Sequence, residues 1–306
     1  MTDVRRNMAD VPVGSFGFAI GPFARALSDF AEMRGYGFLQ ALDLVACTDL
    51  RVQAEQSAVI KWIRKYDWGN SDLRGLDSLA SHDAFALEAH LARFGVTGHF
   101  SGLAKGQIGV VSTFLAPMGW RVTAKPVTLE RMESGMAASY RAFRLPASTC
   151  ARQALSGAPF TDRVTAQASD GSSVMLAMLP DGAEGPQDTA SLLQLADRLV
   201  NAYGTPVSTP GGVILPWVSF NSATWLPGLQ GLAVSTPSVE HVVAQACQYM
   251  HLSMNETGQL RRLSFDDDLE SYTVDQHCVA VVMQFEVPVA AFYLAPDCWV
   301  KPLALV

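Results

Sequence analysis

The chain has 306 residues, of which 49% are hydrophobic and 17% are charged, which allows a large buried core and excludes long disordered regions. The formal net charge is −7, which excludes nucleic acid as the main partner because such binding needs clustered Lys and Arg. No signal peptide or membrane span is predicted, because polar residues and prolines interrupt the apolar stretches, and we expect a soluble cytoplasmic protein.

Helical signals dominate the first ninety-odd residues. A helix is expected over 22–34, which starts with a proline and stops before Gly35. A second is expected over 49–66, where Leu50, Ala54, Ala58 and Trp62 recur at helical spacing. A third is expected over 81–94, with Gly95 as its stop.

Strand signals dominate from residue 107 onward. The apolar, β-branched run 107–116 and the alternating run 121–129 predict strands, and 163–169 and 172–179 flank the turn sequence Asp170-Gly171. One more helix is expected over 189–203, followed by strands over 212–220, 241–254, 279–285 and 289–295. In 241–254 the alternation places Val242, Ala244 and Met250 on a buried face and His251 on the other.

This order of elements predicts one α+β domain over residues 1–306, because no long polar linker divides the chain. We expect a large, mostly antiparallel sheet, helices at the N-terminal end and a second, smaller β-sheet layer.

The sequence carries no familiar catalytic motif: GxSxG, HExxH and P-loop patterns are absent. The six histidines do not sit at ligand spacings, so neither a metal nor a cofactor is predicted. The cysteines are odd in number and form no CxxC pair, which indicates free thiols in a reducing compartment (Cys47, Cys150, Cys247, Cys278 and Cys298).

Weak catalytic candidates are Cys247, His251 and Glu256, in the strand region 241–256. Cys247 and His251 share one strand face but lie about 13 Å apart along it, so either group would need a partner from elsewhere in the fold. If the protein is an enzyme, we expect it to be independent of a cofactor.

Six segments form a characteristic series along the chain: 86–98, 109–120 (closing with Trp120), 173–181, 213–220 followed by Leu226, Leu229, Gly231 and Leu232, 243–258, and 285–288 with 298–300. In this order they resemble the serpin family and especially its bacterial members. The resemblance implies that 86–98 is the family's long helix, 109–120 its central strand, 213–232 a strand and a helix, 243–258 the strand leading into the reactive loop, and the last segments its closing strands. It covers a core over 86–306 and leaves a divergent helical part over 1–80, so we interpret the chain as a shortened, divergent serpin.

The resemblance implies a protease trap, in which a protease cleaves the reactive loop and the hinge of the loop inserts into the main sheet. Insertion requires small hinge residues, because alternate side chains enter a close-packed interior. Arg261 and Arg262 are adjacent, so either register buries one arginine at a cost of several kcal/mol, and we predict a disabled hinge. The resemblance assigns the hinge to Glu256, Gly258, Gln259, Arg261 and Arg262, and counting as in the family places the scissile bond near Tyr272 and Thr273.

Three functions stay open at this point. The first is a non-inhibitory serpin-fold protein that acts as a binding or regulatory protein toward a serine protease or a small-molecule ligand. The second is an enzyme that reuses the scaffold for small-molecule, biosynthetic chemistry. The third is a functional serine protease inhibitor.

Overall fold

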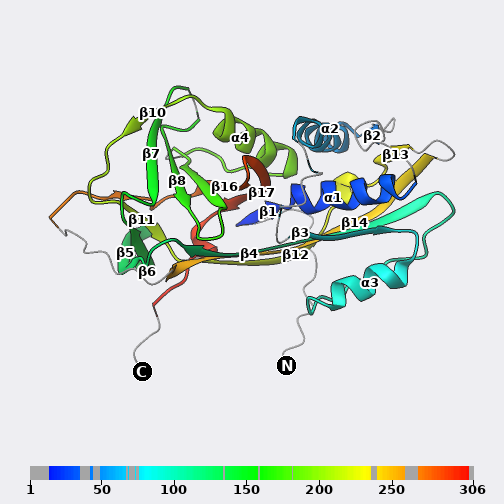
Figure 1. The fold of residues 1–306 in the computed structure, drawn as a ribbon, viewed down its shortest axis with the longest axis horizontal. Helices are drawn as coiled ribbons and strands as arrows, with labels where there is room; N and C mark the ends of the chain where they lie inside the picture. The colour runs from blue at the N-terminus through cyan, green and yellow to red at the C-terminus, as the bar shows by residue number, and fades with distance from the viewer. Residues whose placement is uncertain are drawn as a thin grey trace.

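The computed structural model describes residues 14–34, 42–43, 49–66, 68, 73, 76–133, 135–157, 159–180, 182–235, 240–258 and 268–302. These residues form three β-sheets with helices packed beside them, which confirms the predicted α+β class (Figure 1). No helix in these ranges has the length and apolar character needed to span a membrane.

The four helices of the described ranges are α1 (Ile20–Glu32), α2 (Leu50–Lys65), α3 (Ala84–Ala92) and α4 (Thr189–Asn201), close to the predicted positions. The third is shorter than expected, because Asp83 caps its first turn and it ends at Ala92, before Thr97 and Gly98. It is therefore not the long helix that the resemblance implies.

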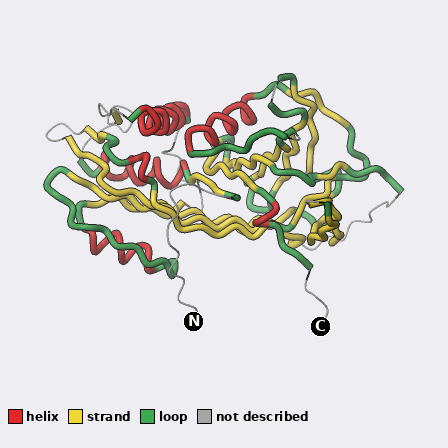
Figure 2. Tube along the Cα trace, turned by 180° about the vertical axis from the view of Figure 1, so that it is seen from behind, coloured by secondary structure: helices red, strands yellow, loops and turns green. Residues whose placement is uncertain are grey.

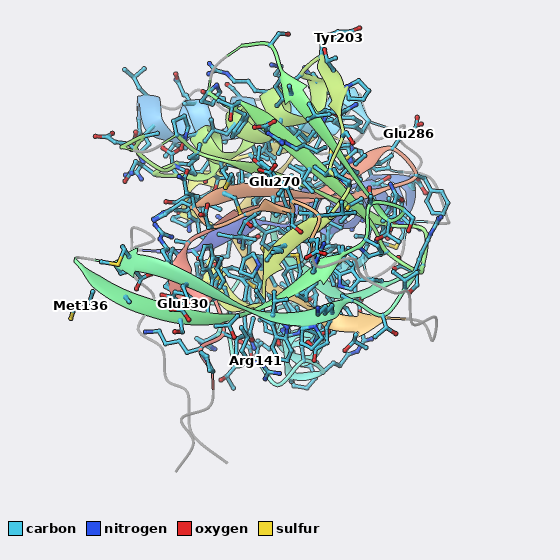
Figure 3. The ribbon with its side chains drawn as sticks, turned by 90° about the vertical axis from the view of Figure 1, so that its left-hand side faces the viewer. Glu130, Met136, Arg141, Tyr203, Glu270 and Glu286 are labelled. Atoms are coloured by element: carbon cyan, nitrogen blue, oxygen red, sulfur yellow. The ribbon has the colours of Figure 1, made fainter. Side chains whose placement is uncertain are left out.

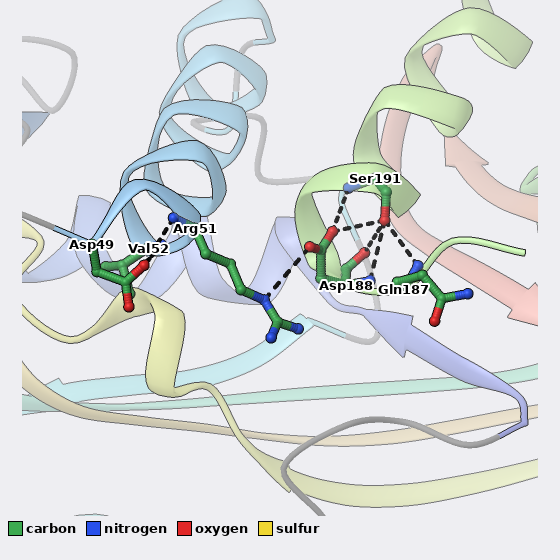
Figure 4. Close-up of polar contacts among 6 residues, drawn as sticks. All are labelled: Asp49, Arg51, Val52, Gln187, Asp188 and Ser191. Carbon is green, nitrogen blue, oxygen red and sulfur yellow. Dashed lines mark hydrogen bonds and ion pairs between the residues drawn. The ribbon is translucent and has the colours of Figure 1, made fainter.

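Helices α2 and α4 lie next to each other and begin with acidic caps (Figure 4). The Asp49 carboxylate accepts a 2.9 Å hydrogen bond from the Arg51 backbone N–H, and Asp188 and Ser191 form a reciprocal capping box. The Arg51 side chain then reaches from α2 to Asp188, with Nε 3.8 Å from Oδ2. The two helix starts are thus tied together by a charge contact.

The candidate site lies in the central sheet. Its strand order is β2 (Leu42–Asp43), β13 (Ala233–Ser235), β14 (Glu240–Gly258), β4 (Gln107–Trp120) and β3 (Leu76–Ser81). Strand β12 (Val218–Trp225) also pairs with β14. The predicted strands 107–116 and 241–254 are therefore neighbours in one sheet, and they run parallel to each other. In Figure 1, α1 and α2 lie on one side of this sheet and α3 lies on the other.

A bulge in β14 changes which side chains are buried. The register shifts between Val243 and Gln245, so Ala244 is an extra residue. His241 and Val243 face the core before the bulge, whereas Ala246, Met250 and Leu252 face it afterwards. The simple alternation predicted for 241–254 is therefore correct only after Gln245, and Val242 and Ala244 are not buried.

The second sheet has seven antiparallel strands, and Figure 2 shows it beside the central sheet. In sheet order the strands are β1 (Phe16–Phe18), β17 (Val287–Leu294), β16 (Cys278–Gln284), β9 (Ser173–Met178), β8 (Asp162–Gln167), β7 (Cys150–Leu155) and β10 (Gly204–Val207). The predicted core strands 279–285 and 289–295 are β16 and β17. The predicted turn at Asp170-Gly171 joins β8 and β9, and Gly171 has the positive φ of +90° that such a turn requires.

The third sheet has the order β15 (Tyr272–Thr273), β11 (Val213–Pro216), β6 (Met136–Leu145) and β5 (Lys125–Glu133). The hairpin of β5 and β6, with Glu130 and Met136, projects from the body of the molecule in Figure 3. The expected single strand 212–220 is wrong, because the chain leaves this sheet at Trp217 and continues as β12 in the central sheet. The expected helix around Leu226–Leu232 is only a short 3-10 turn, Pro227–Leu229.

Candidate functional site

The candidate site is the contact between β4 and β14, which we call the seam, together with the two strand ends that flank residues 259–271. The strands pair in parallel from Gln107 and Val242 at one end to Trp120 and Gly258 at the other. Their backbones are direct neighbours over this whole length, so no other strand lies between them. The site is therefore a closed seam.

One end of the seam is held by Trp120, the last residue of β4. Its ring is fully buried and stacks obliquely on Phe143, with the ring centroids 5.5 Å apart. Its indole Nε1 donates a 2.6 Å hydrogen bond to the backbone oxygen of Asn255 in β14. Next to this contact, the Thr257 N–H donates a 2.9 Å hydrogen bond to the Asn255 side chain.

The predicted hinge residue Glu256 lies at this end of the seam and faces β6. Its Oε1 is 4.0 Å from Nη2 of Arg141, and its backbone oxygen accepts a hydrogen bond from Ala124. The Arg141 guanidinium in turn lies 3.2 Å from the ring centroid of Trp217, a cation–π contact (Figure 3 labels Arg141). Glu256 therefore links the end of β14 to the third sheet.

The other flank of residues 259–271 is β15, which contains the predicted scissile pair. Tyr272 N–H donates to Gly212 O at 3.0 Å and Val274 N–H donates to Ile214 O at 2.9 Å, so Tyr272 and Thr273 are part of a paired strand. The Arg152 guanidinium lies 4.1 Å from the Tyr272 ring centroid, and burial raises the pKa of Tyr272 to about 12. The structure thus places both half-buried residues in the edge strand of a sheet, where β11 pairs with them on one side.

The residues just before β15 are held in place by Arg144, a buried residue of β6. Its guanidinium donates to the backbone oxygens of Gly211 and Leu269. Ser271 also donates to Gly211 O at 3.0 Å, and Gly211 N–H donates to Glu270 O at 3.1 Å. Residues 269–274 are therefore fixed to β6 and β11.

The segment between the two flanks is nearly as long as the seam. Thirteen residues, 259–271, separate the last residue of β14 from the first residue of β15. At about 3.3 Å per residue, 13 residues span at most about 43 Å, and the 14 residues of β4 span about 46 Å. Strand β14 uses more residues over the same length because its register shifts twice. Gln259, Arg261 and Arg262 of the predicted hinge lie outside the described residues.

The weak catalytic candidates on β14 are not brought together. Cys247 is buried beneath α3 in a cluster with Leu87 and Phe100, and burial raises the pKa of its thiol to about 12. His251 lies further along the same strand, opposite Asn221 and Leu115, while Glu256 faces Arg141. The four described cysteines are all buried free thiols. This arrangement offers no nucleophile with an adjacent base.

The sequence analysis did not identify Arg141 and Arg144, the two arginines of β6 that contact the flanks of the site. Residues 136–145 gave no strand prediction, although Tyr140, Ala142 and Phe143 are buried in β6. Arg144 is only 6% exposed, and arginines are usually placed outside when a sequence is interpreted. The one available signal was the apolar stretch from Tyr140 to Leu145, which is interrupted by the two arginines.

No protein-family model and no curated protein matches this sequence. Solved structures do match it. Tengpin, a thermophilic serpin crystallised in its native state, has a TM-score of 0.53 at 8% identity over 92% of this chain and 88% of that one. Serpin-12 of Manduca sexta has a TM-score of 0.53 at 10% identity over 93% of both chains. Human thyroxine-binding globulin has a TM-score of 0.50 at 8% identity over 92% of this chain and 91% of that one. The chain therefore has the serpin fold.

Proposed function

We propose that this serpin-fold protein is not an efficient protease trap and acts as a binding or regulatory protein. The observation that carries the proposal is the position of Arg261 and Arg262 shortly after the end of the closed seam formed by β4 and β14. A trap works by inserting the cleaved segment into the seam, and the distance over which it can move a protease is set by the residues between Gly258 and the cleaved bond. The 13 residues before Tyr272 nearly match the 14 residues of β4, so the length of the segment leaves insertion possible and its side chains decide the outcome.

The two arginines oppose insertion in either register of the strand. Arg261 and Arg262 are the third and fourth residues after Gly258. Because neighbouring residues of a strand point to opposite faces, one of the two guanidinium groups would have to enter the sheet interior in either register. An unpaired buried charge costs several kcal/mol, which would slow the first steps of insertion. A protease would then complete hydrolysis and leave.

The partner is proposed to be a protease that cleaves the chain as a substrate, or a small-molecule ligand. Human thyroxine-binding globulin, by its name a binding protein, has the same fold. A shallow hollow of about 300 Å³ between α2 and α4 would suit a small ligand; it is lined by Ala58, Lys61, Trp62, Leu193, Gln194, Asp197 and Arg198. The free, buried state of the described cysteines supports a cytoplasmic location, and we treat 1–306 as one domain.

Incubation with a trypsin-like and a chymotrypsin-like protease, followed by denaturing gels, tests the proposal. We expect a cleaved chain and no covalent adduct that survives denaturation, because the protease would hydrolyse the acyl-enzyme before insertion could distort its active site. A catalytically inactive protease serves as the control for non-covalent complexes. A stable adduct, with one molecule of protease inactivated per molecule of this protein, would show that the protein is an inhibitor and would contradict the proposal.

A further inference from the structure

Two histidines that are far apart in the sequence meet at the end of the seam opposite Trp120. His82 follows directly after β3, and His241 is the second residue of β14. Their ring centroids are 5.0 Å apart with the planes tilted by 49°. Both rings contact the edge or face of Phe30 in α1, at 5.4 Å and 5.1 Å between centroids. Such a pair is invisible to any search for ligands at short spacing.

The tautomer of His82 is fixed by the backbone. Its Nδ1 lies 2.7 Å from the carbonyl oxygen of Gln107, and a carbonyl oxygen can only accept, so Nδ1 must carry the hydrogen. The lone pair is then on Nε2, and the His82 side chain is exposed to solvent. A ring that donates one N–H to a carbonyl and offers its other nitrogen is the usual state of a metal-binding histidine.

His241 is buried and has unused hydrogen-bonding capacity. It is only 7% exposed, and its Nδ1 is buried with no hydrogen-bond partner in the described structure. Burial, followed by the charges of His82 and Arg34, lowers the pKa of His241. A neutral imidazole is the form that binds a metal ion. Leaving its buried nitrogen unpaired has a cost that a ligand would remove.

We propose that His82 and His241 together bind a divalent transition-metal ion of the kind that prefers imidazole, Zn²⁺ in the first place, with water as the remaining ligands. Imidazole nitrogen suits Zn²⁺, Ni²⁺ and Cu²⁺ and does not suit Mg²⁺ or Ca²⁺. The ring centroids are 5.0 Å apart, and the exposed side of His82 provides access for the ion and its waters.

The charges around the pair are mixed. The guanidinium of Arg34 lies 3.6 Å from the Phe30 ring centroid and opposes a cation. Two exposed acidic residues are neighbours of the pair in the chain: Asp83 directly follows His82, and Glu240 directly precedes His241. With two protein ligands, the site is weaker than a structural zinc site with four. The bound ion would connect the ends of β3 and β14 across β4, since β4 pairs with both strands. The site is independent of whether the protein traps proteases.

Thermal unfolding of the chelator-treated full chain with added ZnCl₂ tests the site. At pH 7.5 and a zinc concentration ten times the dissociation constant, we expect Tm to rise by about 2 °C, and we expect no rise with MgCl₂. His82→Gln, at an exposed position, should fold normally and lose the shift. His99→Gln, which changes a histidine on the far side of α3, should keep it. Direct zinc titration by calorimetry gives a second measurement on the same variants.

Two results would overturn the site. One is the absence of any zinc-dependent shift or binding heat in the unaltered protein. The other is zinc binding by His82→Gln that is as tight as that of the unaltered protein, which would place the ion elsewhere. His241→Gln is measured by calorimetry only if its unfolding curve shows that it is folded; retained zinc binding there would also overturn the assignment.

Discussion

The indole nitrogen of Trp120 donates a 2.6 Å hydrogen bond to the backbone oxygen of Asn255, joining the last residue of β4 to the end of β14. Residues 259–271 leave β14 three residues later, after Gly258. Any strand that enters the seam must first separate β4 from β14 at this point. The bond therefore holds the closed state at the end where opening would begin.

Replacing Trp120 with Phe removes this bond and keeps an aromatic ring against Phe143. We expect a loss of about 1–3 kcal/mol in the free energy of unfolding, because the Asn255 oxygen is left without its partner. Urea unfolding measures the change. Trp225→Phe, at a partly buried indole packed on Phe100, is the matched control. Equal losses in the two variants would show that the hydrogen bond contributes little.

The buried histidine His241 predicts a decline in stability at mildly acidic pH. Its pKa in the folded protein is lowered from the ordinary value of 6.5, by burial first and then by His82 and Arg34. The unfolded chain therefore binds this proton more readily. The stabilisation is fully present above pH 6.5 and is lost as the pH falls below that value toward the folded pKa. The pKa values of His90 and His277 are lowered by burial too, and they act with the same sign.

Urea unfolding at pH 7.5, 6.5 and 5.5 without added metal measures this effect. We expect the free energy of unfolding to fall with pH and the fall to be smaller in His241→Gln. His99→Gln, whose side chain is 86% exposed, should behave like the unaltered protein. An unchanged slope in the His241 variant would contradict the account of this residue.

The described thiols are expected to be unreactive in the folded protein. Burial raises the pKa of Cys150 to about 11 and that of Cys247 to about 12, so almost no thiolate is present at pH 8. In a Cys47→Ser variant, a chromogenic disulfide reagent should label the remaining four cysteines only when the chain unfolds. Rapid labelling of Cys247 in the native protein, located by mass spectrometry, would contradict this and support the enzyme alternative.

The arginines of the segment, and not its length, should limit insertion. The 13 residues of 259–271 nearly match the 14 residues of β4, so removing both charges should allow the cleaved segment to enter the seam. We expect the Tm increase on cleavage of Arg261→Ala with Arg262→Ala to exceed that of the unaltered protein by at least 5 °C, on the order of 3 kcal/mol for a chain of this size. No difference between the two would show that the arginines are not limiting.

Much of the fold follows from patterns that are local in the sequence. The positions of α1, α2 and α4 come from helical periodicity, and the β8–β9 hairpin from Asp170-Gly171. The order of segments also led to the correct fold family, and the strands 107–116 and 241–254 are in one sheet.

The remainder could not be predicted because it depends on tertiary contacts. The bulge at Ala244 reverses the burial pattern of β14, which no alternation reveals. The chain leaves the third sheet just after Trp217, whose N–H still donates to the backbone oxygen of Arg141, a residue far away in the sequence. The count that placed the scissile bond at Tyr272 assumed the usual loop length of the family, and here β15 begins at that residue.

Whether the seam accepts the cleaved segment is best measured by unfolding the protein before and after a single cut within 259–271. Mass spectrometry identifies the cut, and urea or thermal unfolding follows for both forms. We predict nearly equal stability, within about 1 kcal/mol, because a strand with two adjacent arginines stays out. A nicked form that resists unfolding by tens of degrees more than the intact protein would mean full insertion, and the account of a closed seam would be wrong.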